Sequence, residues 1–141
     1  MEVYSTMDSG EAHRNPQGLI LLAEDNLANR KVAEIQLSRL GYVTLAVLNG
    51  RECVAAFMQP GARFSLILMD CNMPVMDGYA ATQEIRRVEE TGKEGRTPIV
   101  AMTANVMEGD RELCLAAGMD DYLAKPVSQD AMREMMAKWI Q

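Results

Sequence analysis

The chain has 141 residues, of which 48% are hydrophobic and 24% are charged, proportions typical of one soluble globular domain. Its formal net charge of −6 argues against nucleic acid as a direct partner, because no basic stripe offsets the acidic residues. No apolar stretch approaches the roughly 20 residues needed to cross a bilayer, so we expect no membrane contact by this domain.

Residues 1–17 contain no apolar signal-peptide core, and we expect them to form a flexible tail or linker. The domain itself is expected over residues 18–141. Short apolar runs there predict strands at Leu19–Ala23, Val43–Val47, Ser65–Met69, Ile99–Met102 and Asp121–Leu123. Helical patterns follow each run, at residues 27–40, 50–59, 78–90, 108–117 and 129–140. Five such units predict an α/β fold in which helices cover both faces of a parallel sheet.

Local signals agree with this division into elements. Asn49 and Asp77 stand where N-caps of the second and third helices are expected, and Gly41 follows the first helix as a C-cap. The last helix carries one apolar face, which we interpret as core: Met132, Met135, Met136 and Trp139. The three cysteines, Cys53, Cys71 and Cys114, form no metal-binding pattern and are expected to be buried thiols in a reducing compartment.

Acidic residues follow two of the predicted strands. Asp70 comes directly after the apolar run Leu66–Met69, and Glu24 and Asp25 follow the first strand. Ligands of parallel α/β sheets bind beyond the carboxyl ends of the strands, so these acids converge if strands one and three are neighbours. Clustered carboxylates repel one another unless a cation such as Mg²⁺ binds them. The alternative is a group of solvated acids that cap nearby helices.

Two further strands end in residues that suit a phosphoryl group. Thr103 follows the fourth strand and Lys125 follows the fifth. Singly, a threonine here is usually a turn residue and a lysine is usually solvated. Together with the acids they predict a phosphoryl site, in which a metal and Lys125 neutralise oxygens, Thr103 donates a hydrogen bond and one aspartate attacks.

These positions resemble the receiver domain of two-component response regulators over residues 18–141. The resemblance is carried by Glu24-Asp25-Asn26, by MDCNMPVMDG at residues 69–78, by Thr103-Ala104 and by Lys125-Pro126. It implies a flavodoxin-like, doubly wound sheet of five parallel strands in the order 2-1-3-4-5, with five helices.

The resemblance also implies roles for single residues. Asp70 would be the phosphoacceptor, paired with Lys125 in the empty site. Glu24, Asp25, Asp70 and the backbone carbonyl of Asn72 would hold Mg²⁺, with Mn²⁺ as an alternative. Thr103 would move to bond the phosphoryl group, and Tyr122 would follow it inward as part of the switch. The Lys125-Pro126 bond is expected to be cis.

The phosphoryl donor is expected to be another protein. The one histidine, His13, lies in the tail, and no glycine-rich nucleotide loop is present, so a histidine kinase or histidine phosphotransfer domain is implied. The domain would thus be a phosphoacceptor that promotes its own phosphorylation and dephosphorylation, and not an enzyme with a separate substrate.

The first helix suggests a surface for that partner. Its wheel places Val32, Ala33, Leu37 and Leu40 on a core face. The opposite face, together with the loop after the fifth strand, gives the expected docking residues: Leu27, Ala28, Lys31, Ile35, Pro126 and Val127. The alternative is scattered exposed apolar residues.

The wording EDN, MDCNMPVMDG and MTAN…GMDDYLAKP favours a receiver from a hybrid histidine kinase. The location would then be cytoplasmic, even where the parent chain is membrane-anchored. A free-standing response regulator is the alternative. A Mg²⁺-dependent phosphohydrolase with an aspartyl nucleophile fits less well, because it needs an acid where Asn72 stands. The intact site residues disfavour a degenerate receiver that only binds partners.

Overall fold

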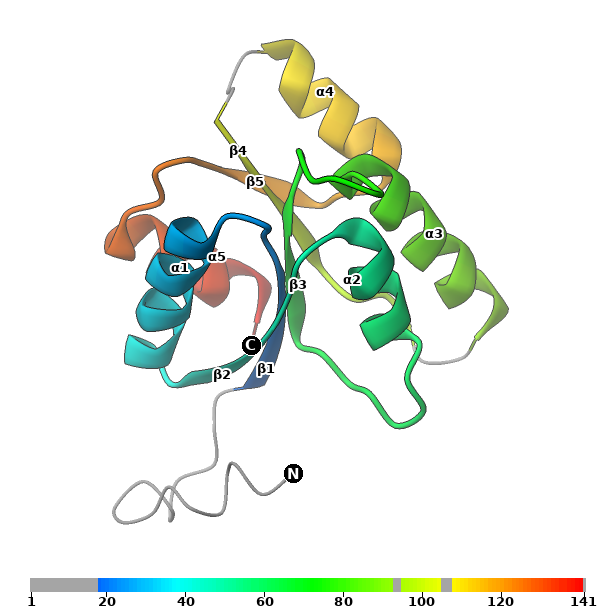
Figure 1. The fold of residues 1–141 in the computed structure, drawn as a ribbon, viewed down its shortest axis with the longest axis horizontal. Coiled ribbons are helices and arrows are strands. Elements are labelled where there is room, and N and C mark those ends of the chain that lie inside the picture. Colours follow the sequence, from blue (N-terminus) through cyan, green and yellow to red (C-terminus); the bar gives the residue numbers. More distant parts are fainter. Residues whose placement is uncertain (1–17, 93–94, 105–107, 141) are drawn as a thin grey trace.

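A computed structural model describes residues 18–92, 95–104 and 108–140 of the chain. Its sheet contains β1 (Gly18–Ala23), β2 (Tyr42–Val47), β3 (Leu66–Asp70), β4 (Ile99–Thr103) and β5 (Asp121–Ala124). All neighbouring strands are parallel, in the order β2-β1-β3-β4-β5 (Figure 1). The expected strand order is therefore confirmed, and each strand lies within one or two residues of its predicted position.

The described part of the chain also contains five helices, and they cover both faces of the sheet (Figure 1). They are α1 (Leu27–Arg39), α2 (Gly50–Phe57), α3 (Gly78–Thr91), α4 (Glu108–Ala117) and α5 (Gln129–Trp139). Helices α1 and α5 pack on one face, and α2, α3 and α4 pack on the other. Asn49 and Asp77 accept hydrogen bonds from the third residue of α2 and α3, as N-caps do.

The central strands are buried because both faces are covered. All five residues of β3 are buried, including Asp70 at its end. Side chains alternate between the two helical layers, so that Ile67 joins the cluster under α2 and α3, whereas Leu66 and Leu68 join the cluster under α1 and α5. Met132 and Met136 complete the second cluster, which confirms the predicted apolar face of the last helix.

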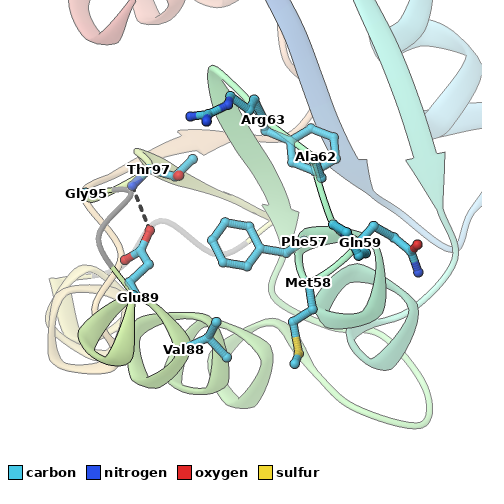
Figure 2. Close-up of a pocket in the computed structure, with 13 residues that line it drawn as sticks. Phe57, Met58, Gln59, Ala62, Arg63, Val88, Glu89, Gly95 and Thr97 are labelled. Carbon is cyan, nitrogen blue, oxygen red and sulfur yellow. Dashed lines mark hydrogen bonds between the residues drawn. The ribbon is translucent and has the colours of Figure 1, made fainter.

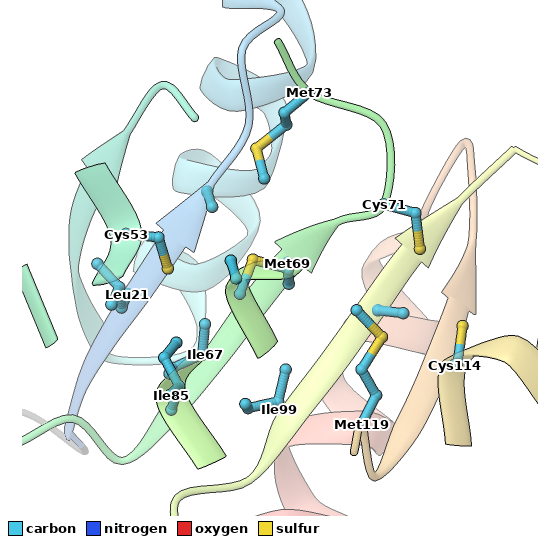
Figure 3. Close-up of a cluster of buried hydrophobic side chains, with 13 residues drawn as sticks. Leu21, Cys53, Ile67, Met69, Cys71, Met73, Ile85, Ile99, Cys114 and Met119 are labelled. Carbon is cyan, nitrogen blue, oxygen red and sulfur yellow. The ribbon is translucent and has the colours of Figure 1, made fainter. Parts of the chain in front are cut away.

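The cysteines all lie on the side of α2, α3 and α4. Figure 3 shows Cys53, Cys71 and Cys114 among the apolar side chains of that cluster. All three are buried thiols that form no disulfide, as expected. Burial raises the pKa of the Cys53 and Cys71 thiols to about 12, so both are protonated and unreactive near neutral pH.

One part of the prediction for α1 is wrong. Ala33 and Leu37 are buried as predicted, but Val32 is 52% exposed and the polar Gln36 is only 8% exposed. Val32 lies at the border of the buried arc, and Gln36 takes the inner position because its amide hydrogen-bonds the loop after β5. Val32 therefore extends the outward apolar face of α1.

Candidate functional site

The parallel register brings the polar strand ends together at one edge of the sheet. Ala23 of β1 is level with Met69 of β3, so that Glu24 and Asp70 are the next residues on two adjacent strands. On the other side of β3, the pairing of Thr103 with Ala124 places Lys125 just beyond the end of β5. Glu24, Asp70 and Thr103 are at most 4% exposed.

Lys125 forms ion pairs with both buried acids. Its Nζ lies 2.9 Å from Glu24 Oε1 and 3.2 Å from Asp70 Oδ2. The pair with Asp70 was predicted, whereas the shorter pair with Glu24 was not. The remaining carboxylate oxygens accept backbone hydrogen bonds, Glu24 Oε2 from Asn26 at 3.1 Å and Asp70 Oδ1 from Asn72 at 3.2 Å.

The surroundings shift the pKa values of Asp70 and Lys125. Burial and the nearby Glu24 charge raise the pKa of Asp70 to about 6, although the Asn72 amide and Lys125 act in the opposite direction. Burial lowers the pKa of Lys125, but its contacts with Glu24 and Asp70 outweigh this effect and the net pKa is raised. At neutral pH the site therefore contains an ionised aspartate beside a charged lysine.

The acids form a group that fits a divalent cation. One carboxylate oxygen from each of Glu24, Asp25 and Asp70 lies within 4.8 Å of the others. Two of these side chains are buried, whereas Asp25 is exposed and leaves the site open to solvent. Hard oxygen donors with an open side are the ligand set that Mg²⁺ takes in phosphoryl sites. The three residues expected to hold Mg²⁺ by their side chains are thus brought together.

The loop between β3 and α3 is held tightly against the site. A Cβ at Gly78 would meet the backbone carbonyl of Asp70 and, at 3.0 Å, the Cα of Cys71, so only glycine permits this approach. The Gly78 amide donates to the Cys71 carbonyl at 3.1 Å. Within the loop, Val75 has a φ of 70°, an unfavourable conformation for a β-branched residue.

The remaining predicted residues lie around the same edge of the sheet. Tyr122 is half-buried and packs against the cluster under α3 and α4. The Lys125-Pro126 bond is cis, as expected.

The predicted docking residues on α1 are all exposed. Leu27 and Ile35 are 56% and 53% exposed, and Ala28 and Lys31 are exposed too. A cavity of about 110 Å³ separates α1 from Pro126 and Val127, and Glu24 and Lys125 also line it.

A larger cavity lies away from this edge of the sheet. Its volume is about 470 Å³, and Figure 2 shows Phe57, Val88 and Glu89 around it. The residues that line it come from the end of α2, the following loop, the end of α3 and the segment before β4. It therefore lies at the amino ends of β3 and β4, opposite the acids.

Sequence reasoning missed two polar networks. Arg86 of α3 bonds Asp120 at 2.8 Å, Glu89 at 2.7 Å and the carbonyls of Gly118 and Thr97. Gln36 and Gln129 link α1 to the start of α5 and the loop before it. Both networks join residues far apart in the chain, for which no local pattern gives a signal.

Comparisons with known proteins agree with the site. The sequence model of the response regulator receiver domain matches residues 20–137. The chain belongs to this family. The hybrid signal transduction protein dokA of Dictyostelium discoideum is 42% identical over 128 residues, which cover 89% of this chain and 7% of dokA. The chain spans at most 18% of the length of the curated relatives compared.

Solved receiver domains share the fold. The receiver domain of the sensor histidine kinase PA1611 from Pseudomonas aeruginosa, with magnesium in its active-site cleft, is 47% identical, with a TM-score of 0.75. The match covers 87% of this chain and 97% of that one. A chain in the co-crystal structure of the Saccharomyces cerevisiae phosphotransfer protein Ypd1 with the Ssk1 receiver domain is 30% identical, with a TM-score of 0.81 and coverage of 89% and 90%.

These findings identify a receiver domain of the kind found in hybrid histidine kinases and other phosphorelay proteins. They do not favour the aspartyl phosphohydrolase. Among the residues that the structure describes, no helix is long and apolar enough to cross a membrane.

Proposed function

We propose that Asp70 accepts a phosphoryl group from a phosphohistidine on a partner protein. A P–O bond to an Asp70 carboxylate oxygen forms while the P–N bond to the partner's imidazole breaks, and the imidazole nitrogen keeps the electron pair. The observation that carries the proposal is the position of Asp70, which ends a buried strand with its carboxylate beside Lys125 and within the acidic group. With a pKa of about 6, Asp70 is ionised and nucleophilic at neutral pH.

The neighbouring residues would stabilise the transferred group. Lys125 carries a positive charge beside Asp70 and would pair with phosphoryl oxygens once Asp70 is modified. Thr103 ends the adjacent strand, and we propose that its hydroxyl moves to bond the phosphoryl group. Half-buried Tyr122 would follow it inward, so that phosphorylation changes the surface near β5.

Glu24, Asp25, Asp70 and the backbone carbonyl of Asn72 are the proposed Mg²⁺ ligands. Bound there, the ion would neutralise charge on the phosphoryl oxygens. Mn²⁺ prefers the same oxygen donors and is a second candidate.

The proposed partner is a histidine kinase or a histidine phosphotransfer domain. Leu27, Ala28, Lys31 and Ile35 are exposed on α1, the helix that follows Glu24 and Asp25, and Pro126 is exposed where a small cavity separates it from α1. We call these residues, together with Val127, the docking surface. Exposed apolar residues on a helix suit a helical partner. The solved complex of Ypd1 with the Ssk1 receiver, a structural relative, supports this class of partner.

Residues 18–141 would form the whole receiver domain, preceded by a flexible tail at residues 1–17. We propose that it belongs to a hybrid histidine kinase, since the chain matches only a small part of such relatives. A free-standing regulator is the second candidate. A cytoplasmic location fits the three buried thiols, none of which forms a disulfide. The domain would promote its own phosphorylation and dephosphorylation without a separate substrate.

The test is intact mass after incubation with acetyl phosphate, in Mg²⁺ and in EDTA. We expect the wild type to gain one phosphoryl group only in Mg²⁺, and Asp70→Asn to gain none. An unmodified wild type under both conditions would overturn the proposal. Release of free phosphate without a labelled protein would instead favour hydrolysis.

A further inference from the structure

Two glutamines connect α1 to the chain that follows β5. Gln36 Nε2 donates to the backbone carbonyl of Val127 at 2.7 Å. In return, Gln129 Nε2 donates to the backbone carbonyl of Gln36 at 3.0 Å. The first bond joins residues 91 positions apart and the second joins residues 93 positions apart. The pair therefore forms a reciprocal link between α1 and the segment around Val127.

The link borders a small cavity that it shares with both the phosphorylation site and the docking surface. Gln36 lines the cavity of about 110 Å³, whose wall also includes Glu24 and Lys125 of the site and Pro126 and Val127 of the docking surface. Val127 follows Lys125 by two residues. A change in the link would therefore move Pro126 and Val127 relative to the docking residues on α1.

Packing alone does not account for glutamine at positions 36 and 129. Gln36 is only 8% exposed, and the amide oxygens of Gln36 and Gln129 are buried with no hydrogen-bond partner among the described residues. A buried amide oxygen without a partner costs free energy, and two apolar side chains of similar size would avoid that cost. The two side-chain amides instead provide directional hydrogen bonds, because each Nε2–H group holds one backbone carbonyl in position.

We infer that Gln36 and Gln129 are positioning residues, which fix the spacing between α1 and Pro126–Val127 and so set the affinity for a helical phosphodonor protein. The inference rests on the proposed function, because it assigns the docking surface to the donor. Transfer from a small phosphodonor requires the phosphorylation site but no protein docking. The link therefore acts on transfer from a protein and leaves transfer from a small molecule unchanged.

The test compares the double variant Gln36→Leu/Gln129→Leu with the wild type. Gln83→Leu is the matched control, since Gln83 is exposed on α3. Each protein receives phosphoryl groups from phosphorylated Ypd1 over a range of concentrations, and from acetyl phosphate in parallel. Amide hydrogen exchange of residues 127–129 is measured on the same proteins and needs no donor.

For the double variant we expect faster amide exchange at residues 127–129. We also expect an increase of about tenfold in KM for phosphorylated Ypd1 with little change in kcat, the pattern of lost binding at a docking surface. Acetyl phosphate should label the double variant, the wild type and Gln83→Leu at the same rate. That last rate tests the proposed function separately, because it requires Asp70 and Mg²⁺ but no docking.

Three results would overturn the inference. Unchanged exchange at residues 127–129 would show that the two glutamines do not hold this segment. An unchanged KM for a donor that does phosphorylate the wild type would show that the spacing does not affect docking. Equal losses with Ypd1 and acetyl phosphate would make the glutamines structural supports of the phosphorylation site.

Discussion

Lys125, which follows β5, and Asp70, which ends β3, lie at the same edge of the sheet, with Lys125 Nζ 3.2 Å from Asp70 Oδ2. The same ammonium group lies 2.9 Å from Glu24, so one cation pairs with two buried acids. Its pKa is raised because contacts with both acids outweigh its burial, and it stays charged across the physiological range. The geometry thus places a permanent positive charge beside the proposed nucleophile.

Replacing Lys125 by glutamine should slow phosphorylation by acetyl phosphate on the order of 100-fold, because charge on the phosphoryl oxygens loses a preorganised cation. Intact mass followed over time measures the rate. Lys138→Gln is the matched control, since Lys138 lies exposed on α5 and pairs with Asp121. A Lys125→Gln rate equal to that of the control would remove Lys125 from the phosphoryl site.

Asp70 should make stability depend on pH. Its pKa is raised from 3.8 to about 6 in the folded protein, mainly by burial, so the folded state binds more protons than the unfolded state between these values. The stability that protonated Asp70 contributes below its unfolded pKa of 3.8 is therefore lost as the pH rises through about 6. In EDTA at pH 7.5 we expect Asp70→Asn to be more stable than the wild type by about 1 kcal/mol.

Urea unfolding at several pH values measures this difference, which should shrink as the pH approaches 4. Added Mg²⁺ should stabilise the wild type more than the variant, because a ligand that binds only the folded state shifts the equilibrium toward it. A variant less stable than the wild type in EDTA at pH 7.5 would contradict the raised pKa.

Val75→Asn should stabilise the fold. Val75 is 71% exposed and has a φ of 70°, so the substitution loses little packing and removes an unfavourable backbone conformation. Asparagine tolerates this conformation, and we expect a gain of about 1 kcal/mol in the free energy of unfolding. A loss of stability in urea unfolding would mean that Val75 is not strained in solution.

Arg86→Met should destabilise the protein by about 2 kcal/mol, because it removes the buried cation that pairs with Glu89 and Asp120. The loss is partly offset because the amides of Thr97 and Ile99 still donate to these two acids, and Arg96 still pairs with Asp120. Arg87→Met is the natural control on the same helix. Its pair with Glu84 is exposed, and its loss should cost less than about 1 kcal/mol. Similar losses for the two variants would show that the Arg86 network contributes little.

The elements and the acidic group could be predicted from the sequence because both depend on local patterns. The buried run Leu66–Met69 followed by Asp70 identifies a strand and its end. A parallel sheet then brings such ends to one edge, so that Glu24 and Asp70 meet without knowledge of any side-chain position. The strand order itself came only from the resemblance to a family.

Other features depend on how distant elements pack, which local patterns do not encode. Val32 was expected in the core and Gln36 was not, because a helical wheel ranks side chains by hydrophobicity and ignores a hydrogen bond to Val127. The contact between Lys125 and Glu24 was also missed, because it joins the ends of two strands that are distant in the sequence. The family resemblance assigned Glu24 to the metal, whereas the structure pairs it with the lysine.

The identity of the modified residue is the central claim, and peptide mapping after borohydride reduction tests it most directly. Reduction converts an aspartyl phosphate to homoserine, which leaves a permanent mark at the modified position. After treatment with acetyl phosphate and Mg²⁺, trypsin should release residues 64–86 with homoserine in place of Asp70. Homoserine at another aspartate, or an unmodified Asp70 in a protein that carries a phosphoryl group, would contradict the account.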